Sequence, residues 1–182
     1  MTASPVIADE FRYVDATDDL ARPLLAELEV EYDTRYGDFF GERASTELNR
    51  YPAEEFAAPR GAFVLLLRGG EPIAGGAFKR YDERTAELKR IWTSSTHRRE
   101  GLGRRVVAEL ESEAVRRGYT RVYLTTGPRQ PEAKALYLAA GYTPLYDPAL
   151  PAEEVGIHPF EKTLSAPPTG AGAGTGRTGA RR

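Results

Sequence analysis

The spacing of apolar residues changes several times along the chain, which indicates a protein that mixes helices with strands. From Asp18 to Tyr36, leucine and tyrosine recur at every fourth position, a spacing that predicts an amphipathic helix capped by Asp18 or Asp19. A short strand is predicted before this helix, at residues 11–14, and a second short helix after it, around residues 45–56.

Three apolar strands are predicted next. The segment AFVLLLRGGEPIAGGAFKRY indicates two strands joined at residues 68–71, because consecutive glycines suit the positive φ angles of a tight hairpin turn. A third strand, residues 85–93, follows after a short polar turn. Three consecutive strands with short connections predict an antiparallel meander, which differs from the alternating strands and helices of a dinucleotide-binding fold.

The second half of the chain predicts helices that alternate with strands. The helix after RREGLG has one apolar face and ends at Gly118, and the next helix is bracketed by Pro131 and Gly141. In order, the predicted elements are helix 102–117, strand 121–125, helix 131–140, and strands 142–146 and 157–164. Together with the first half, this order predicts a mixed α/β sandwich around one sheet.

Length and composition fit one folded domain. The chain has 182 residues, of which 41% are hydrophobic, enough for one substantial core. Residues 165–182 are rich in glycine, alanine, proline and threonine, which cannot bury enough apolar area to offset the entropy of ordering a backbone. We therefore expect a single domain over residues 1–164 and a disordered tail over residues 165–182.

The charge and residue inventory excludes several classes of protein. Acidic residues outnumber lysine and arginine by 27 to 25, and residues 166–182 add three arginines and no acid, so the predicted domain is the more acidic part. Such a domain lacks the basic surface of a nucleic-acid binder, and no nucleic-acid partner is expected. The chain has no cysteine and only two histidines, His97 and His158, so no metal site is expected.

No segment predicts export or membrane insertion. The N-terminal stretch MTASPVIADEF lacks a basic region followed by a long apolar run, and no later apolar run approaches about 18 residues. We therefore expect a cytoplasmic protein without a membrane partner.

Two glycines one residue apart, surrounded by arginines, lie where a predicted strand meets a predicted helix, in RREGLG at residues 98–103. Amides at a helix N-terminus bind phosphate, glycine lets a bulky phosphate approach them, and arginines add positive charge. The dinucleotide fingerprint would require a third glycine where this chain has Val106, and the P-loop pattern is absent. The turn predicts a pyrophosphate-bearing ligand.

From Phe63 to Leu145, the order of features resembles the GNAT superfamily of acyl-CoA-dependent N-acyltransferases. RREGLG matches the family's [RQ]-x-x-G-x-[GA] turn, ELKRIWT the strand before it, RVYLTT the next strand, and residues 133–142 the segment A-x-x-L-Y-x-x-x-G-Y. The resemblance implies that residues 1–164 form one GNAT-like acetyltransferase domain of the mixed α/β (α+β) class. It further implies a mainly antiparallel central sheet with a splayed strand pair and helices on both faces.

The same resemblance implies acetyl-CoA as the acyl donor. Its pyrophosphate is expected on the turn, and its pantetheine arm along the preceding strand, like an added strand that needs no particular side chains. Gln130 stands where the family usually has asparagine, which is a better helix N-cap than glutamine. The expected coenzyme contacts are Ile91, Trp92, Thr93, Arg98, Arg99, Glu100, Gly101, Leu102, Gly103, Arg104 and Gln130.

The resemblance also implies three groups at the reacting atoms. The Ile91 amide corresponds to the donor to the thioester carbonyl, and Tyr137 to the tyrosine that protonates the departing thiolate, although Tyr137 also fits a core position. Glu87 lies eleven residues before the turn, where some members carry the base that deprotonates the amine. The alternative for Glu87 is an ion pair with Lys89 or Arg80. Strand alternation predicts that Glu87, Lys89 and Ile91 share one face.

The acceptor is expected beside the acidic first helix, where Tyr32, Asp33 and Tyr36 are the candidate contacts. The expected reaction is direct transfer of acetyl to a primary amine of a small molecule or peptide, by a monomer or homodimer. A covalent acyl-enzyme is disfavoured because the chain lacks cysteine and a G-x-S-x-G serine. Open alternatives are a longer acyl-CoA or an alcohol acceptor, a non-catalytic acyl-CoA sensor and, with the weakest support, a dinucleotide oxidoreductase.

Overall fold

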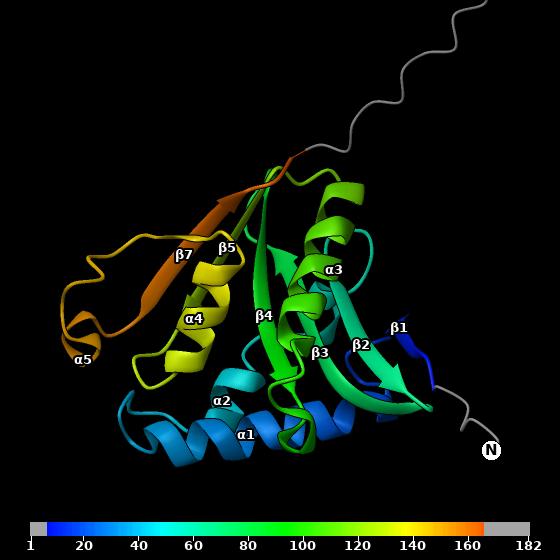
Figure 1. The fold of residues 1–182 in the computed structure, drawn as a ribbon, viewed down its shortest axis with the longest axis horizontal. Helices are drawn as coiled ribbons and strands as arrows, with labels where there is room; N and C mark the ends of the chain where they lie inside the picture. The colour runs from blue at the N-terminus through cyan, green and yellow to red at the C-terminus, as the bar shows by residue number, and fades with distance from the viewer. Residues whose placement is uncertain (1–6, 166–182) are drawn as a thin grey trace, which may run out of the picture.

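The computed structural model describes residues 7–165, which fold around one seven-stranded sheet of order β1-β2-β3-β4-β5-β7-β6 (Figure 1). The predicted tail lies outside the described residues, apart from Ser165. The strands are β1 (Asp9–Tyr13), β2 (Ala62–Arg68), β3 (Glu71–Arg80), β4 (Thr85–Thr93), β5 (Arg121–Thr126), β6 (Thr143–Pro144) and β7 (His158–Thr163). The α-helices are α1 (Arg22–Tyr36), α2 (Ala44–Leu48), α3 (Leu102–Arg116), α4 (Pro131–Ala139) and α5 (Ala152–Val155), and three 3₁₀ turns are η1 (Asp19–Ala21), η2 (Ala53–Phe56) and η3 (Ser95–His97).

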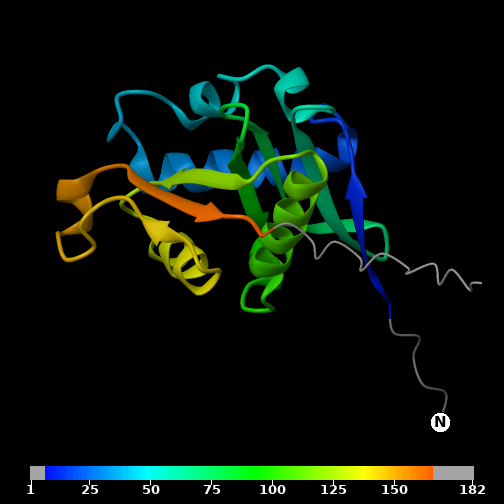
Figure 2. The same ribbon diagram turned by 90° about the horizontal axis from the view of Figure 1, so that it is seen from above.

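Helices cover both faces of the sheet, with α1 and α2 on one side and α3 and α4 on the other (Figure 2). Each side has its own apolar core, and β2 supplies both. Val64 and Leu66 pack in the core with α3, whereas Phe63 and Leu65 pack in the core with α1. Burial on both faces explains why β2 is an unbroken apolar run rather than an alternating one. The predicted fold class is confirmed.

The predicted meander is also confirmed. Strands β2, β3 and β4 pair antiparallel, and the β2–β3 turn contains Gly69 and Gly70 with φ angles of 60° and 84°. These angles are strained for residues with a side chain, so the two glycines fix a tight turn. The predicted helix ends also hold, because Gly118 and Gly141 follow α3 and α4 with positive φ.

The sheet opens between β4 and β5, the parallel pair at its centre. Only residues 85–87 of β4 pair with residues 121–123 of β5, although β4 continues to Thr93 and β5 to Thr126. The strands diverge toward the N-terminal end of α3 (Figure 1). Past residue 87, the edge of β4 that faces β5 is therefore left without a partner strand in the described part of the chain.

A β-bulge at Arg90 changes the face of the sheet toward which the side chains at the end of β4 point. The β3–β4 register shifts between Gly75 and Ala77, and Arg90 has a φ of 59°, uncommon for a residue other than glycine. Because one extra residue is inserted, Ile91 packs toward α3, where its Cδ1 would lie 2.6 Å from a Cβ added at Gly76. The prediction that Glu87 and Ile91 share a face is therefore wrong, because alternation fails at the bulge.

The N-terminal helices differ in detail from the prediction. The predicted helix from Asp18 begins as the turn η1, capped by the Asp18 carboxylate, and becomes α-helical at Arg22, next to Pro23. The predicted helix around residues 45–56 is instead the separate elements α2 and η2, because Pro52 cannot continue an α-helical hydrogen-bond ladder. Of the predicted strand at 142–146, only β6 forms, and α5 had no sequence signal.

Candidate active site

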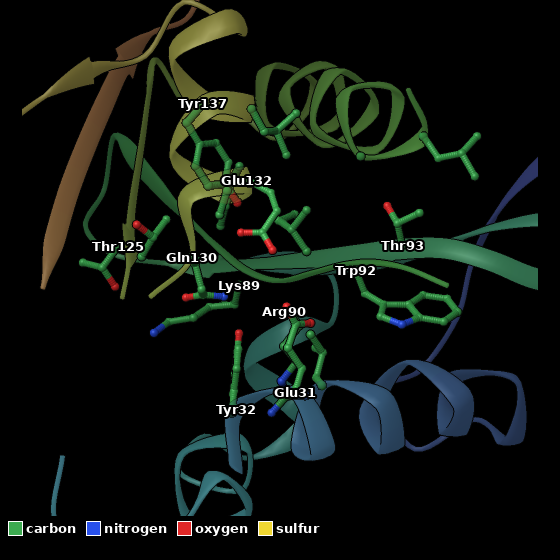
Figure 3. Close-up of a pocket in the computed structure, with 18 of the residues that line it drawn as sticks. Glu31, Tyr32, Lys89, Arg90, Trp92, Thr93, Thr125, Gln130, Glu132 and Tyr137 are labelled. Atoms are coloured by element: carbon green, nitrogen blue, oxygen red, sulfur yellow. The ribbon is translucent and has the colours of Figure 1, made fainter. Parts of the chain in front are cut away.

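A cavity of about 540 Å³ occupies the opening between β4 and β5 and extends from the α3 side of the sheet to α1 and α2. Figure 3 shows Tyr137 from α4 and Tyr32 from α1 on opposite sides of it, with Gln130 and Lys89 between them. Residues far apart in the sequence therefore share one cavity, which has two ends. We call them the turn end, formed by residues 91–104, and the helix end, formed by α1, α2, η2 and residues 89–90 of β4.

The turn end has the geometry expected of a phosphate site. Gly101 is the N-cap of α3 with a φ of 72°, and Arg99 also has a positive φ, of 66°. The first amides of α3 have no partners within the helix, so they are available to an anion. Gly103 is closely packed, because an added Cβ would lie 3.3 Å from Leu136 Cδ2 and 3.6 Å from Thr93 Oγ1. A larger residue there would narrow the cavity.

Side chains of the turn form ion pairs that hold it against the rest of the domain. Arg98 lies 3.8 Å from the Glu31 carboxylate of α1, and Glu100 lies 3.0 Å from Arg68 of β2. Arg98, Arg99 and Arg104 line the cavity, whereas Glu100 points to Arg68 and does not. Of the predicted coenzyme contacts, Glu100 is thus the one that the structure does not bring to the cavity.

Glu27 of α1 anchors the end of β4 that leads into the turn. Its Oε2 accepts hydrogen bonds from Trp92 Nε1 at 3.1 Å and from the Ser95 amide at 3.0 Å. Trp92 packs in the core with α1 and is also one of the residues that line the cavity. These bonds fix the end of β4 to α1.

Gln130 closes a hydrogen-bonded corner between α1 and the start of α4. Its Oε1 accepts from the Gly127 amide at 3.0 Å and from the Tyr36 hydroxyl at 3.2 Å, and it makes no capping bond to α4. A Cβ at Gly127 would lie only 2.1 Å from the Tyr36 hydroxyl oxygen. Gln130 lines the cavity, whereas Tyr36 supports it from behind.

Tyr137 lies in the cavity wall with its ring 5.5 Å from that of Tyr142 and 5.9 Å from that of Phe160. Burial raises its pKa well above the ordinary value, and the nearby Tyr32 raises it further. The phenol therefore stays protonated at neutral pH. Its hydroxyl has no hydrogen-bond partner among residues 7–165, which leaves the proton available to a ligand.

The helix end mixes aromatic walls with charged groups. Tyr32 and Tyr51 line it together with Glu47 of α2 and with Lys89 and Arg90 of β4. Burial raises the pKa of Tyr32, and Glu31 and Glu47 raise it further, so both carboxylates lie near this phenol.

Asp33 is not brought to the cavity. Its carboxylate accepts a hydrogen bond from the Ala44 amide at 3.1 Å, at the start of α2. Of the three predicted acceptor contacts, only Tyr32 therefore lines the cavity.

Glu87 is almost fully buried beside two lysines. Its carboxylate lies 3.3 Å from Lys89 Nζ and 3.6 Å from Lys79 Nζ, while Arg80 pairs with Glu83 instead. Glu87 does not line the cavity, but Lys89 does. The ion-pair alternative is thus seen with Lys89, and Lys79 replaces the expected Arg80.

The histidines have structural surroundings. His158 is buried, stacks on Tyr146 with ring centroids 4.5 Å apart, and lies 3.1 Å from the Ala152 carbonyl oxygen through Nε2. His97 contacts the Thr96 hydroxyl at 2.9 Å. Over residues 7–165, no cluster of three or more potential ligands could hold a metal ion. Within the same span, no helix combines the length and the apolar character needed to cross a membrane.

Sequence reasoning missed Glu47, Lys89 and Thr126 as cavity residues. Thr126 is buried at the end of β5, and its Oγ1 has no partner in the described part of the chain, as is also true of Glu47 Oε2. Glu47 lies in a short, polar helix with no motif, so only the tertiary structure reveals it. Lys89 had a signal, because its strand was predicted to line the ligand site.

The arrangement has counterparts among known proteins. Residues 25–142 match the family described as Acetyltransferase (GNAT). YsnE of Bacillus subtilis, described as an uncharacterized N-acetyltransferase, is 34% identical over 91 residues, which cover 49% of this chain and 60% of that protein. The match thus spans less than two thirds of that relative.

Two solved structures show the same fold. A Klebsiella pneumoniae protein described as an acyl-CoA N-acyltransferase has a TM-score of 0.66 at 25% identity, over 86% of this chain and 98% of that one. PaiA N-acetyltransferase of Thermoplasma acidophilum, solved with coenzyme A, has a TM-score of 0.66 at 15% identity, over 86% of this chain and 99% of that one.

Proposed function

Because the chain belongs to the GNAT family of acetyltransferases, we propose that it transfers the acetyl group of acetyl-CoA directly to a primary amine of a small molecule or peptide. The observation that carries this proposal is the single cavity in which the glycine turn, the open edge of β4 and Tyr137 meet. The expected cytoplasmic location and the monomeric or homodimeric state stay predictions.

The turn end fits the coenzyme. A pyrophosphate would be held by the first amides of α3 and by Arg98, Arg99 and Arg104, and Gly103 leaves room for an extended arm beside Thr93. The unpaired edge of β4 from Ile91 to Thr93 offers backbone groups to that arm, as in strand addition. The bound acetyl-CoA supplies an activated acyl group, and the protein supplies position and proton transfer.

Two groups are proposed at the reacting atoms. The Ile91 amide, next to the bulge, would donate to the acyl oxygen as negative charge develops there. Tyr137 would donate its proton to the departing thiolate. Burial supports this role because it removes the water that would otherwise compete as a donor.

Glu87 stays our candidate for the base that takes the proton from the acceptor amine. Its carboxylate is shared by Lys79 and Lys89 and does not line the cavity, so the proton would have to travel through a water molecule. If Glu87 only holds the lysines, solvent takes the proton instead, and the two roles differ in the rate expected of the Glu87→Gln enzyme.

The decisive experiment is an acetylation assay with the full chain, acetyl-CoA and a panel of amines that includes amino acids, polyamines, aminoglycosides and peptides with free N-termini. We expect a mass increase of one acetyl group on at least one amine, which requires both enzyme and acetyl-CoA. Coenzyme A binding by calorimetry without turnover on any amine would overturn the proposal in favour of an acyl-CoA sensor. Transfer only to alcohols, or only from longer acyl-CoA donors, would correct its substrate.

A further inference from the structure

Glu47 has an unusual position at the helix end of the cavity. Its Oε2 is buried and makes no hydrogen bond to any described residue, while the residue itself lines the cavity. Arg50 Nε lies 3.9 Å from Oε2, too far for a hydrogen bond. A buried carboxylate oxygen without a donor is costly, so a ligand donor at this place would stabilise it.

Three other carboxylates in or near the cavity do not offer this. Asp33 binds the backbone of α2, and Glu87 is shared by two lysines outside the cavity wall. Glu31 lines the cavity, but it is paired with Arg35 at 3.1 Å and with Arg98 at 3.8 Å. Glu47 therefore has the carboxylate oxygen that is best placed to receive an ammonium group.

Part of the wall around Glu47 is apolar and aromatic. Leu28, Tyr32, Leu48, Tyr51 and Phe56 line this end of the cavity. Such a lining favours an acceptor that carries its amine on an apolar or aromatic body, because that body is then removed from water.

Two cations in the same walls disfavour a second positive charge on the acceptor. Lys89 Nζ lies 3.7 Å from Glu47 Oε1 and already balances part of its charge. Arg90 stacks on Phe56 with its guanidinium carbon 4.3 Å from the ring centroid, and burial lowers the pKa of this guanidinium. A polyamine would bring further positive charge close to both groups.

We infer that Glu47 Oε2 holds the ammonium group of the acceptor, and that the acceptor is a monoamine with an apolar or aromatic body. This inference rests on the proposed function, because it names the acceptor class for that same cavity. Glu47 is assigned to binding rather than proton removal, so its loss should raise the KM for the amine more than it lowers kcat.

The position of Glu47 relative to the reacting groups supports the assignment. The Glu47 carboxylate lies close enough to Tyr32 to raise its pKa, and Tyr32 in turn raises the pKa of Tyr137. All three residues line the same cavity, in which Tyr32 lies on the side opposite Tyr137 (Figure 3).

The experiment uses two probes that differ only in a second ammonium group, hexylamine and 1,6-diaminohexane. Their binding to the full-length protein is measured by calorimetry with coenzyme A present, and their acetylation is measured by mass spectrometry. We expect the wild type to bind hexylamine at least tenfold more tightly than the diamine. Glu47→Gln should weaken hexylamine binding roughly ten- to hundredfold, the range for a charge-assisted hydrogen bond, and leave coenzyme A binding unchanged.

Glu55→Gln is the matched control. Glu55 lies in η2 on the same side of the sheet and pairs with Lys79 at 3.6 Å, but it does not line the cavity. The control should bind both probes like the wild type, and the melting temperatures of the two variants should be similar.

The outcomes separate this inference from the proposed function. Hexylamine binding that is equal in wild type and Glu47→Gln, or absent from the wild type, would overturn the inference even if other amines are acetylated. Tighter binding of the diamine would overturn the monoamine class. Glu47-dependent binding of hexylamine without any acetyl transfer would instead leave the inference standing and count against the proposed function.

Discussion

The two ends of the cavity are built by different means. The turn end comes from one continuous stretch of chain, residues 91–104, and relies on backbone amides, two glycines and an unpaired strand edge. The helix end comes from α1, α2, η2 and β4, and relies on side chains, several of them charged and partly buried.

This difference determines what each end tolerates. Where backbone groups bind the ligand, removing a side chain lowers the affinity little, and adding a side chain obstructs the ligand. Where side chains bind, removing a single polar group deprives the ligand of its partner and leaves other buried groups unpaired. Substitutions of Tyr137 and Glu87 test the chemistry between the two ends. Substitutions in the turn test whether the backbone, rather than side chains, binds the ligand there.

The largest effect is expected from Tyr137→Phe. The change keeps the ring and its packing against Tyr142 and Phe160 but removes the proton that we assign to the departing thiolate. The kcat should fall roughly a hundred- to ten-thousandfold, with little change in coenzyme A affinity or melting temperature. Steady-state kinetics and calorimetry measure both, and an unchanged kcat would leave Tyr137 a core residue only.

Glu87→Gln should have the next largest effect. If Glu87 accepts the amine proton, kcat/KM should fall roughly a hundredfold near neutral pH. Steady-state kinetics at one fixed pH measure this loss, and coenzyme A affinity should stay unchanged.

The ion pairs of Glu87 require a control for this second prediction. Lys79→Met removes one ammonium partner of Glu87 and keeps the carboxylate, so it should retain most of the wild-type kcat/KM. A Glu87→Gln enzyme that keeps its kcat/KM would show that Glu87 only orders the lysines.

Gly103→Val tests whether an added side chain obstructs the ligand at the turn end. The new methyl groups would occupy the space beside Leu136 and Thr93 without requiring a positive φ, so the Kd for coenzyme A should rise roughly ten- to hundredfold with a small change in stability. Gly101→Ala is the comparison, because its φ of 72° predicts a stability loss of about 1–2 kcal/mol with no side-chain clash. Equal coenzyme affinity in wild type and Gly103→Val would remove this glycine from the binding surface.

The smallest effect is expected from Arg98→Ala. Arg98 is exposed, and within residues 7–165 its one ion pair is the long contact with Glu31, so the amides of α3 should keep most of the affinity. A rise in the coenzyme A Kd of about two- to fivefold is expected, and it should shrink as salt increases. A loss as large as that of Gly103→Val would mean that charge, rather than backbone, dominates at the turn end.

The same difference explains how far the sequence could predict the site. The turn was predicted because its glycines lie close together in sequence and their spacing reflects one local backbone geometry. The meander, the helix stops at Gly118 and Gly141 and the fold class followed from equally local signals. Glu47 could not be found, because its role depends on where α2 packs relative to β4 and not on any neighbour in sequence.

The bulge at Arg90 shows a second kind of limit. Alternation along β4 is a local rule, and it failed because one extra residue reversed the faces after Lys89. The sequence around Arg90 contains neither glycine nor proline to mark the irregularity. The deciding partner lies across the sheet at Gly76, where the absent side chain leaves room for Ile91.

The short pairing of β4 with β5 creates two exposed strand edges in the middle of the sheet. Exposed edges are usually a hazard, because another polypeptide can add to them and begin aggregation. Here α4 lines the gap from one side and α1 with α2 from the other, so the opening admits a thin, extended molecule far more readily than a second protein chain. The unpaired backbone groups of β4 and β5 thus lie at the centre of the fold, where α1, α2 and α4 shield them from pairing with another polypeptide.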